Sequence, residues 1–506
     1  MSESTSSESL SDLKIGDVFT PPEWGAFAVE KFGVFEQWVK GASVFDPTMG
    51  TGNLLEALID TGLKKGYTLD QLPTDRLFGN ELNQTYHRQA LTNFLEKYGW
   101  DMSDQFSNED ILDFSNSRKF DVVLGNPPWI NFVDLPDHYK TIVKSAFFEY
   151  DLVRDSRNLL LGGSRIDFAA LVIQKSMLDF LTKEGNAYFF LPLSLLLNDG
   201  ANQEFRTYCI GETHFAPKAV YDFNQYPAFK DISTRYGLVH FKRDAKANFP
   251  IPYFHMESNQ WNETTARPIF HPHDPLSIQD PKQPDPLATF TPVQISKNSI
   301  PRQGINTCGA NAVFFFDEYQ QTNDSMCVVN GSIQLPAEFV YPLLTSANFS
   351  SREIVAKKWV LLPYQQNGKP LTLKQLKAHS ALYAYLLKHR QTLESRKGSL
   401  IGNWIQKERW WALLGVGPYN FSRHKVVWQA YGKKTFNPIL VPERFQANQS
   451  LQAYMPFNSK KEANRVFREL RQPAVEAYLR SLRMEGTMNW AQPGKVKKLI
   501  RYTDSD

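Results

Sequence analysis

An asparagine, two prolines and a tryptophan at positions 126–129 are the residues of this chain best suited to chemistry. They follow residues 120–125, a short apolar run that predicts a buried parallel strand. The prolines exclude a helix start and extend the turn at the carboxyl end of the strand, where open α/β sheets bind ligands. The Asn126 amide, the Pro127 carbonyl and the Trp129 ring together suit an exocyclic amine on a flat ring. Asn-Pro-Pro alone is also typical of a plain surface turn.

A second predicted strand, residues 41–46, runs into Asp46, Pro47, Gly50 and Gly52 before an apolar helix. Strand, glycine turn and helix together let a small ligand approach the backbone closely. The spacing matches neither the dinucleotide nor the triphosphate fingerprint, so it favours a smaller ligand with a cationic or neutral tail. A lone Gly-x-Gly is also typical of an ordinary turn.

Two further acids follow predicted strands. Glu81 comes roughly 30 residues after the glycine turn, and a carboxylate at that place can accept hydrogen bonds from both hydroxyls of a ribose. Asp110 stands at the end of the next strand candidate, ahead of the strand that leads to Asn126. Each acid alone could be a solvated strand end, but their order predicts one cofactor site along a single sheet edge.

In this order the motifs resemble those of S-adenosylmethionine-dependent DNA methyltransferases of the N6-adenine type. Residues 46–52 are similar to motif I of that family, Glu81 to motif II, Asp110 to motif III and residues 126–129 to motif IV. Residues 18–23 resemble motif X, which contacts the methionine part of the cofactor. Motif X first and a recognition domain last is the order of the γ group, the TaqI-like enzymes. The resemblance implies S-adenosylmethionine as cofactor, bound by Thr20, Pro21, Asp46, Pro47, Gly50, Gly52, Glu81, Asp110 and Asn126.

The resemblance also implies methyl transfer to adenine N6 in double-stranded DNA, with the target base flipped out of the helix. The expected catalytic residues are Asn126, Pro127, Pro128 and Trp129, and no metal is expected. Trp129 would stack on one face of the base and Phe229, which stands where the family places motif VIII, on the other. Phe223 is a rival for the second position, and a core aromatic is an equally good interpretation of Phe229.

The expected fold is α/β, with a Rossmann-like mixed sheet of seven strands and helices on both faces, followed by an α+β target-recognition domain. We expect residues 1–14, which are rich in Ser, to be disordered and residues 15–245 to form the catalytic domain. Residues 246–295, rich in Pro, His, Asn and Gln, predict an irregular linker, and residues 296–506 the basic DNA-recognition domain.

Charge divides unevenly along the 506 residues although the net charge is only +3. Residues 1–240 hold 21 Lys and Arg against 33 Asp and Glu, whereas residues 241–506 hold 35 against 20. Residues 351–450 hold 17 against 4, interleaved with Trp404, Trp410 and Trp411, which could equally form a core. This basic half predicts a polyanion partner. The candidate DNA-binding residues are Arg302, Lys357, Lys358, Arg396, Lys397, Lys407, Arg409, Arg423 and Lys425.

Composition excludes several other classes of protein. The cysteines, Cys209, Cys308 and Cys327, are too scattered for a disulfide framework or a zinc site, which favours a cytoplasmic location. No apolar run is long enough for a membrane span.

We expect a separate restriction endonuclease or defence-complex subunit as partner, since no nuclease motif accompanies the modification motifs. Two alternatives stay open: an RNA or protein amino-group methyltransferase with the same Asn-Pro-Pro-aromatic turn, and a catalytically silent DNA-binding subunit.

Overall fold

The computed structural model describes residues 18–502, apart from 116–117, 155–164, 199, 225, 231, 233, 270, 280–290, 352, 432–434, 450–451 and 482–490. The expected disordered segment 1–14 lies outside the described residues. The chain divides into two compact units, Met1–Asp285 and Pro286–Asp506, and each is described by itself.

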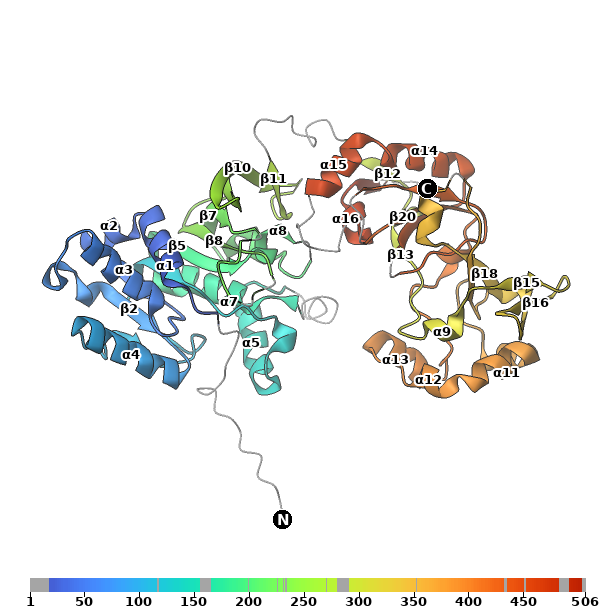
Figure 1. Cartoon of the computed structure of the whole chain (residues 1–506), viewed down its shortest axis with the longest axis horizontal. Helices are drawn as coiled ribbons and strands as arrows, with labels where there is room; N and C mark the ends of the chain where they lie inside the picture. Colours follow the sequence, from blue (N-terminus) through green and yellow to red (C-terminus); the bar gives the residue numbers. More distant parts are fainter. Residues whose placement is uncertain are drawn as a thin grey trace, which may run out of the picture. The chain divides into compact units, whose positions relative to one another are not determined.

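A mixed sheet forms the centre of the first unit (Figure 1). Its strands run in the order β11-β10-β9-β7-β8-β5-β4-β1-β2-β3, and β6 pairs with β7. Within the described residues they span Val44–Asp46 (β1), Leu77–Asn80 (β2), Phe106–Ser107 (β3), Phe120–Gly125 (β4), Leu181–Pro192 (β5), Cys209–Ile210 (β6), Thr213–Asp222 (β7), Tyr236–Arg243 (β8), Ile251–Glu257 (β9), Gln260–Pro268 (β10) and Leu276–Gln279 (β11).

The half of this sheet from β5 to β3 is parallel. Strand β1 lies at its centre, where Val44 is level with Leu77 of β2 and with Val122 of β4. All three residues of β1 are buried, as expected for a parallel strand that is covered on both faces. The carboxyl ends of β1, β2 and β4 therefore meet at one edge.

Helices cover both faces of the sheet. The helices α1 to α4 share one apolar core with alternate residues of β4 and β5, such as Val122 and Tyr188. On the opposite face, Phe45 stacks on Phe120 and meets Phe180 just after α7. The helices of this unit span Pro22–Lys31 (α1), Val34–Val39 (α2), Asn53–Lys64 (α3), Gln84–Tyr98 (α4), Asp137–Glu149 (α5), Phe168–Lys175 (α7) and Ser194–Leu197 (α8).

The predicted Rossmann-like fold class is confirmed, with an extension of the sheet. Strands β3-β2-β1-β4-β5-β8-β7 are the seven expected strands, and β8 is antiparallel to both of its neighbours. Strands β9, β10 and β11 then continue the sheet beyond β7.

The prediction of an irregular linker at residues 246–295 was wrong for most of that segment. Residues 251–279 contribute β9, β10 and β11 to the main sheet, and all of them belong to the first compact unit. These strands lack a long apolar run because exposed residues interrupt it, as at Pro252 between the buried Ile251 and Tyr253 of β9. Composition alone therefore concealed them.

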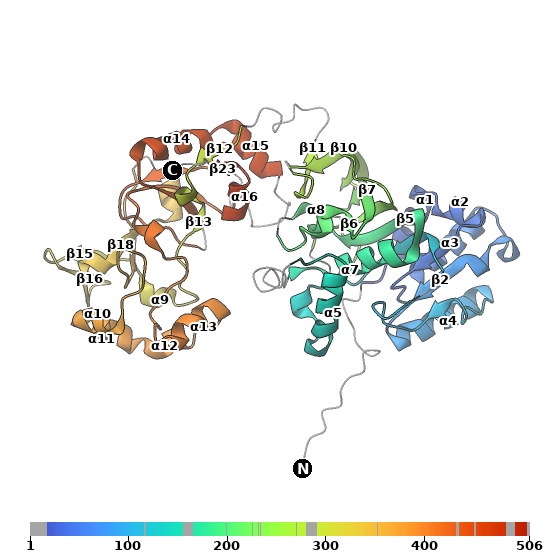
Figure 2. The ribbon, with the colours of Figure 1, turned by 180° about the vertical axis from the view of Figure 1, so that it is seen from behind.

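The second unit is α+β, as predicted, and its sheets are small. Figures 1 and 2 show helices α10 to α13 at one end of this unit and α14 to α16 at the other. Its described strands form four sheets: β12 (Val293–Ile295) with β23 (Ile500–Tyr502); β13 (Arg302–Gln303), β22 (Gln452–Phe457), β20 (His424–Gln429) and β21 (Ile439–Val441); β14 (Phe315–Phe316), β19 (Lys358–Leu361) and β18 (Val340–Leu343); β15 (Tyr319–Gln321), β16 (Met326–Val329) and β17 (Ile333–Pro336). Its described helices span Asn311–Phe314 (α9), Leu373–Ala378 (α10), Ser380–Lys388 (α11), Arg390–Glu394 (α12), Ser399–Gln406 (α13), Lys460–Leu470 (α14), Pro473–Ser481 (α15) and Pro493–Lys497 (α16).

The glycine turn before α3 depends on Gly52. This residue has φ +90°, and a Cβ there would lie 2.9 Å from the ring of Phe94. Gly99, which ends α4, has φ +73° but open space around it. Substitution at Gly99 therefore tests backbone strain alone, whereas substitution at Gly52 tests backbone strain together with steric overlap.

We expect Gly99→Ala to lower the free energy of unfolding by about 1 kcal/mol, because only the left-handed backbone is strained. Gly52→Ala should cost about 1–3 kcal/mol more, because the methyl group also overpacks a buried ring. Urea unfolding of both variants measures the difference. Equal losses would show that the turn does not depend on close packing at Gly52.

Candidate active site

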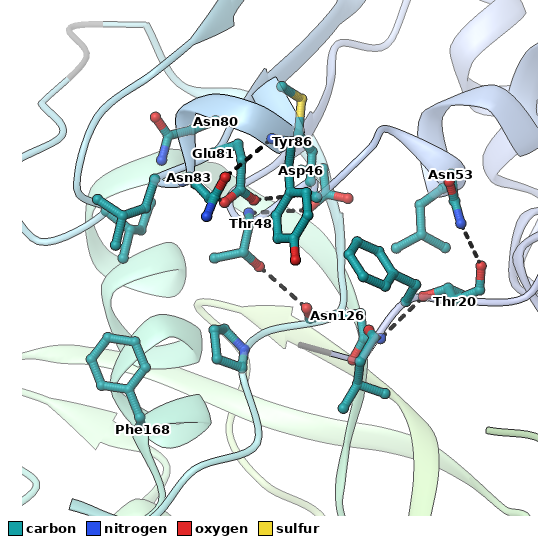
Figure 3. Close-up of a pocket in the computed structure, with 18 of the residues that line it drawn as sticks. Thr20, Asp46, Thr48, Asn53, Asn80, Glu81, Asn83, Tyr86, Asn126 and Phe168 are labelled. Atoms are coloured by element: carbon teal, nitrogen blue, oxygen red, sulfur yellow. Dashed lines mark hydrogen bonds between the residues drawn. The ribbon is translucent and has the colours of Figure 1, made fainter. Parts of the chain in front are cut away.

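A pocket opens at the edge where β1, β2 and β4 end (Figure 3). Six of the nine predicted cofactor residues line it: Thr20, Asp46, Gly50, Glu81, Asp110 and Asn126. The other three, Pro21, Pro47 and Gly52, belong to the same turns but do not line the pocket. Pro128, predicted to be catalytic, also lines it.

Glu81 closes the glycine turn from the end of β2. Its Oε2 accepts a hydrogen bond from the Gly50 N–H at 2.9 Å, and its Oε1 accepts one from the Asn83 N–H at 2.7 Å. The side chain of Asn83 in turn caps α4 by accepting hydrogen bonds from the N–H groups of Thr85 and Tyr86. The carboxylate is therefore fixed between the turn and the helix.

Asp46 is buried at the end of β1. It accepts a hydrogen bond from the Thr48 N–H at 3.1 Å. Burial raises the pKa of Asp46 to about 8, and the nearby Glu81 carboxylate adds to the rise. A buried carboxyl group with a pKa near neutral pH is largely uncharged without a ligand and ionises more readily when a cation binds beside it.

Asp110 and two aromatic residues line another part of the pocket. Asp110 Oδ1 accepts hydrogen bonds from the Leu112 N–H and from the Tyr139 hydroxyl, both at 2.9 Å. Burial raises the pKa of this carboxyl group. Phe168, the first residue of α7, lines the same pocket, and Figure 3 shows it well away from Thr20 and Asn53. A flat ring with a donor group would fit against Phe168 and Asp110.

Three buried oxygens of the pocket have no hydrogen-bond partner within the described part of the chain. They are Asn80 Oδ1, Asp110 Oδ2 and Asn126 Oδ1. Buried acceptors are rarely left unpaired without a reason. The pocket is therefore built for a ligand that brings several N–H or O–H donors.

Asn126 is held at the pocket by its amide nitrogen. The nitrogen donates hydrogen bonds to the Val18 carbonyl at 2.7 Å and to the Thr20 hydroxyl at 3.1 Å. Pro127 is buried beside it. Trp129 is half-buried, and its indole N–H donates to the Phe190 carbonyl at 3.3 Å.

The predicted sandwich of Trp129 and Phe229 around a base is not preformed. The two rings meet edge to face, with centroids 5.2 Å apart and planes at 64°, so no base fits between them. Phe229 is only 2% exposed, and Tyr236 also packs against Trp129. Phe229 is therefore a core aromatic here that supports Trp129. Phe223, the rival, is fully buried as well.

Two of the nine residues predicted to bind DNA, Arg396 and Lys425, are buried and therefore not available at the surface for such a contact. Arg396 is buried and donates to four backbone carbonyls, including those of Thr307 and Ala412. Lys425 is 3% exposed, donates to the Phe445 carbonyl, and has its pKa lowered to about 8 by burial. Both charged groups donate hydrogen bonds to backbone carbonyls inside the second unit.

The other seven reach the surface to different degrees. Arg302 and Arg409 are half-buried, with their guanidinium groups over the rings of Tyr419 and Trp411. Lys358 is exposed and forms an ion pair with Asp317. The remaining exposed residues are Lys357, Lys397, Lys407 and Arg423.

The comparisons with known proteins agree with the motifs. Residues 8–219 match the family model of the N-6 DNA methylases. The match confirms the predicted resemblance to DNA N6-methyltransferases for these residues, which are less than half of the chain. The γ group stays a prediction. No curated protein sequence matches the chain.

Two solved structures share the fold over nearly the whole chain. The Type IIL restriction-modification enzyme MmeI, in complex with DNA, is 14% identical with a TM-score of 0.56, over 92% of this chain and 64% of that one. A nuclease-deletion mutant of the Type ISP enzyme LlaGI, with a DNA substrate mimic, is 11% identical with a TM-score of 0.52, over 96% and 54%. The chain thus spans less than two thirds of either protein.

The family implies S-adenosylmethionine, and the pocket suits it. The molecule carries an ammonium group, two ribose hydroxyls and an adenine amine. These are donors of the kind that the three oxygens without a partner in the described residues can accept. Asp46 and Glu81 both line the pocket, so their carboxyl groups could supply negative charge for its cationic groups. Within the described ranges, no three His, Cys, Asp or Glu side chains come together as a metal site would need. No described helix is both long and apolar enough to cross a membrane.

Sequence reasoning missed several residues that line the pocket, among them Asn80, Asn83, Tyr86 and Tyr139. Asn80 ends β2 and Asn83 caps α4, one on each side of Glu81, so their position next to a predicted strand-end acid offered a signal. Tyr86 and Tyr139 lie on α4 and α5, and their place depends on how those helices pack. Nothing in the local sequence indicated it.

The raised pKa of Asp46 predicts a pH-dependent affinity for S-adenosylmethionine. A cation favours the carboxylate, so below pH 8 binding must first remove the proton. We expect the affinity to rise between pH 6 and 8, by at most about tenfold per pH unit, and to level off above. Titration calorimetry at each pH measures it.

Asp46→Asn is the control for this dependence. The amino group of the ligand titrates in the same range, at about 7.7–8.0, but it does so in both proteins. The difference between the two pH profiles therefore isolates Asp46. Parallel profiles would contradict a proton-linked role for this carboxyl group.

Proposed function

We propose that the chain is a site-specific methyltransferase that transfers a methyl group from S-adenosylmethionine to adenine N6 in double-stranded DNA. The observation that carries this proposal is the buried Oδ1 of Asn126, which lies at the pocket without a hydrogen-bond partner in the described residues. An acceptor in this position suits an amine substrate, and the proline turn and Trp129 follow it directly. The γ-group order of the motifs supports a recognition role for the second unit.

The exocyclic amine of adenine is a poor nucleophile because its lone pair is delocalised into the ring. Asn126 Oδ1 accepts one hydrogen of the amine and the Pro127 carbonyl accepts the other, which favours a tetrahedral nitrogen with an available lone pair. These fixed acceptors also stabilise positive charge that develops on the nitrogen. Bound S-adenosylmethionine supplies an electrophilic methyl group, with Asp46, Glu81 and Asp110 as its anchors.

The target base must leave the duplex to reach the turn, which costs a few kcal/mol. Stacking on Trp129 offsets part of this cost, at ~1–3 kcal/mol per base. The support for this role is that Trp129 is held in place, because Phe229 and Tyr236 pack against its ring and the Phe190 carbonyl accepts a hydrogen bond from its N–H. The second face of the base is left to residues other than Phe229.

The second unit supplies the phosphate contacts in this proposal. Lys357, Lys397, Lys407 and Arg423 are exposed in the segment with 17 basic and 4 acidic residues. Arginine side chains there can also read guanine in the major groove. The biological setting we propose is a restriction or other phage-defence system.

Asn126→Ala tests the catalytic assignment. With tritiated S-adenosylmethionine and unmethylated plasmid DNA, we expect turnover to fall on the order of 10²–10³-fold, because a fixed acceptor at the reacting nitrogen is lost. The affinity for DNA should stay within about twofold, since the second unit keeps its contacts. Nucleoside analysis of the product identifies the methylated base.

The same assay separates the alternatives. Label in RNA or protein but not in DNA would overturn the proposal in favour of an amino-group methyltransferase of another substrate class. Cofactor binding without transfer to any DNA, including genomic DNA of several sources, would favour a catalytically silent DNA-binding subunit. Unchanged turnover of Asn126→Ala would refute the role of the amide.

The surface assignment predicts a difference between two lysines. Lys407→Gln removes an exposed charge, so the slope of log affinity for DNA against log salt concentration should become shallower by about 1. Lys425→Met removes a buried charge and should leave the slope unchanged, even if stability falls. Binding titrations over a range of salt concentrations measure both, and equal slopes for Lys407→Gln and the unmodified protein would contradict the assignment.

A further inference from the structure

The amide of Asn126 is oriented by residues that the reaction itself does not use. Its nitrogen lies 2.7 Å from the Val18 carbonyl and 3.1 Å from the Thr20 hydroxyl (Figure 3). A backbone carbonyl only accepts hydrogen bonds, so the amide atom that faces Val18 must be the nitrogen. The opposite orientation would place two acceptors against each other.

This contact decides which amide atom is offered to a ligand. Both N–H groups of the amide are engaged within the protein, and Oδ1 is left buried without a partner in the described residues. After a 180° turn of the amide, the N–H groups would instead face the hydrogens of a substrate amine. The chemistry requires the oxygen, and residues 18–20 enforce it.

The residues that orient the amide are themselves tied to the glycine turn. Asn53, the first residue of α3, donates from its side-chain nitrogen to the Thr20 carbonyl at 2.9 Å. The Thr51 hydroxyl donates to Asn53 Oδ1 at 2.9 Å. A chain of hydrogen bonds therefore leads from the turn at Gly50 and Gly52 through Thr20 to Asn126.

We infer that the Val18 carbonyl and the Thr20 hydroxyl form an amide lock, which holds Asn126 with its oxygen toward the substrate amine. The inference rests on the proposed function. Thr20, expected only to bind the cofactor, is on this account also a positioning residue for the chemical step. The lock links the cofactor turn to the catalytic amide through Asn53.

Two substitutions at Thr20 test the lock. Thr20→Val keeps the shape and removes the acceptor, so kcat should fall about five- to tenfold, as for the loss of one hydrogen bond. The affinity for DNA should stay within about twofold. We measure kcat at saturating S-adenosylmethionine, because Thr20 also lines the cofactor pocket. Thr20→Ser keeps the hydroxyl and should restore kcat. Thr61→Val, which changes a buried threonine outside the pocket, is the matched control and should keep the kcat of the unmodified protein.

A direct readout does not need activity. In apo protein labelled at asparagine, the side-chain N–H signals of Asn126 are assigned by their absence in Asn126→Ala. We expect slow exchange of these hydrogens with solvent, and faster exchange in Thr20→Val. Fast exchange in the unmodified protein would overturn the lock.

Asn126→Asp gives the sharpest test because only one protonation state suits the lock. An ionised carboxylate sets an oxygen against the Val18 carbonyl, whereas a protonated carboxyl group can donate to it and leave the second oxygen for the substrate. Residual activity should therefore rise as pH falls, by up to about tenfold per pH unit. The other ionisable side chains that line the pocket are Asp46, Glu81, Tyr86, Asp110 and Tyr139. To remove the contribution of these side chains, activity is measured at saturating cofactor, and the pH profile of Asn126→Asp is divided by that of the unmodified protein.

The outcomes separate the two proposals. If the unmodified protein methylates DNA but Thr20→Val keeps full kcat, or Asn126→Asp shows no gain toward acid pH, the lock is wrong and the function stands. If the unmodified protein transfers no methyl group to DNA while the Asn126 hydrogens are protected and freed in Thr20→Val, the function fails and the lock remains a structural feature.

Discussion

The parallel pairing of β1 with β2 and β4 is the constraint on which the whole site depends. It brings the ends of three strands to one level, so the turn after Asp46 can fold over the end of β2. There the Met49 N–H donates to the Asn80 carbonyl at 2.9 Å. Gly79 makes room for this turn, because a Cβ at that position would overlap the sulfur of Met49.

The site collects groups that are unfavourable without a ligand. Asp46 and Asp110 are buried acids with raised pKa values, and three acceptor oxygens lack partners in the described residues. Each unpaired buried acceptor costs about 1–3 kcal/mol, which the rest of the first unit must offset. A ligand rich in donors would relieve this cost, and such concentrations of strained polar groups are typical of functional sites.

Strand-end residues were predictable from the sequence because the carboxyl ends of parallel strands share an edge. Asp46, Glu81, Asp110 and Asn126 are therefore found together, as expected. Packing was not predictable at this level: Phe229 supports Trp129 edge-on, and nothing in its local sequence specifies the angle between the rings.

In the basic second unit, too, side-chain packing could not be predicted from the sequence. A surplus of Lys and Arg indicates a polyanion partner, but the count does not say which side chains face solvent. Arg396 and Lys425 sit among carbonyl oxygens because the turns and strand ends around them leave acceptors to satisfy. In residues 251–279 the half-exposed strands likewise lack the apolar run by which β1 and β4 were recognised.

The choice of an amide at position 126 follows from the acids around it. Asp46, Glu81 and Asp110 already line the pocket, and the pKa of Asp46 is raised partly by Glu81, so another carboxylate would be hard to ionise there. An amide accepts hydrogen bonds at any pH. Unlike a carboxylate, however, it has two different ends, so it is useful only if its orientation is fixed. The contacts of Asn126 with Val18 and Thr20 meet that requirement, which is why a segment more than 100 residues away in sequence belongs to this site.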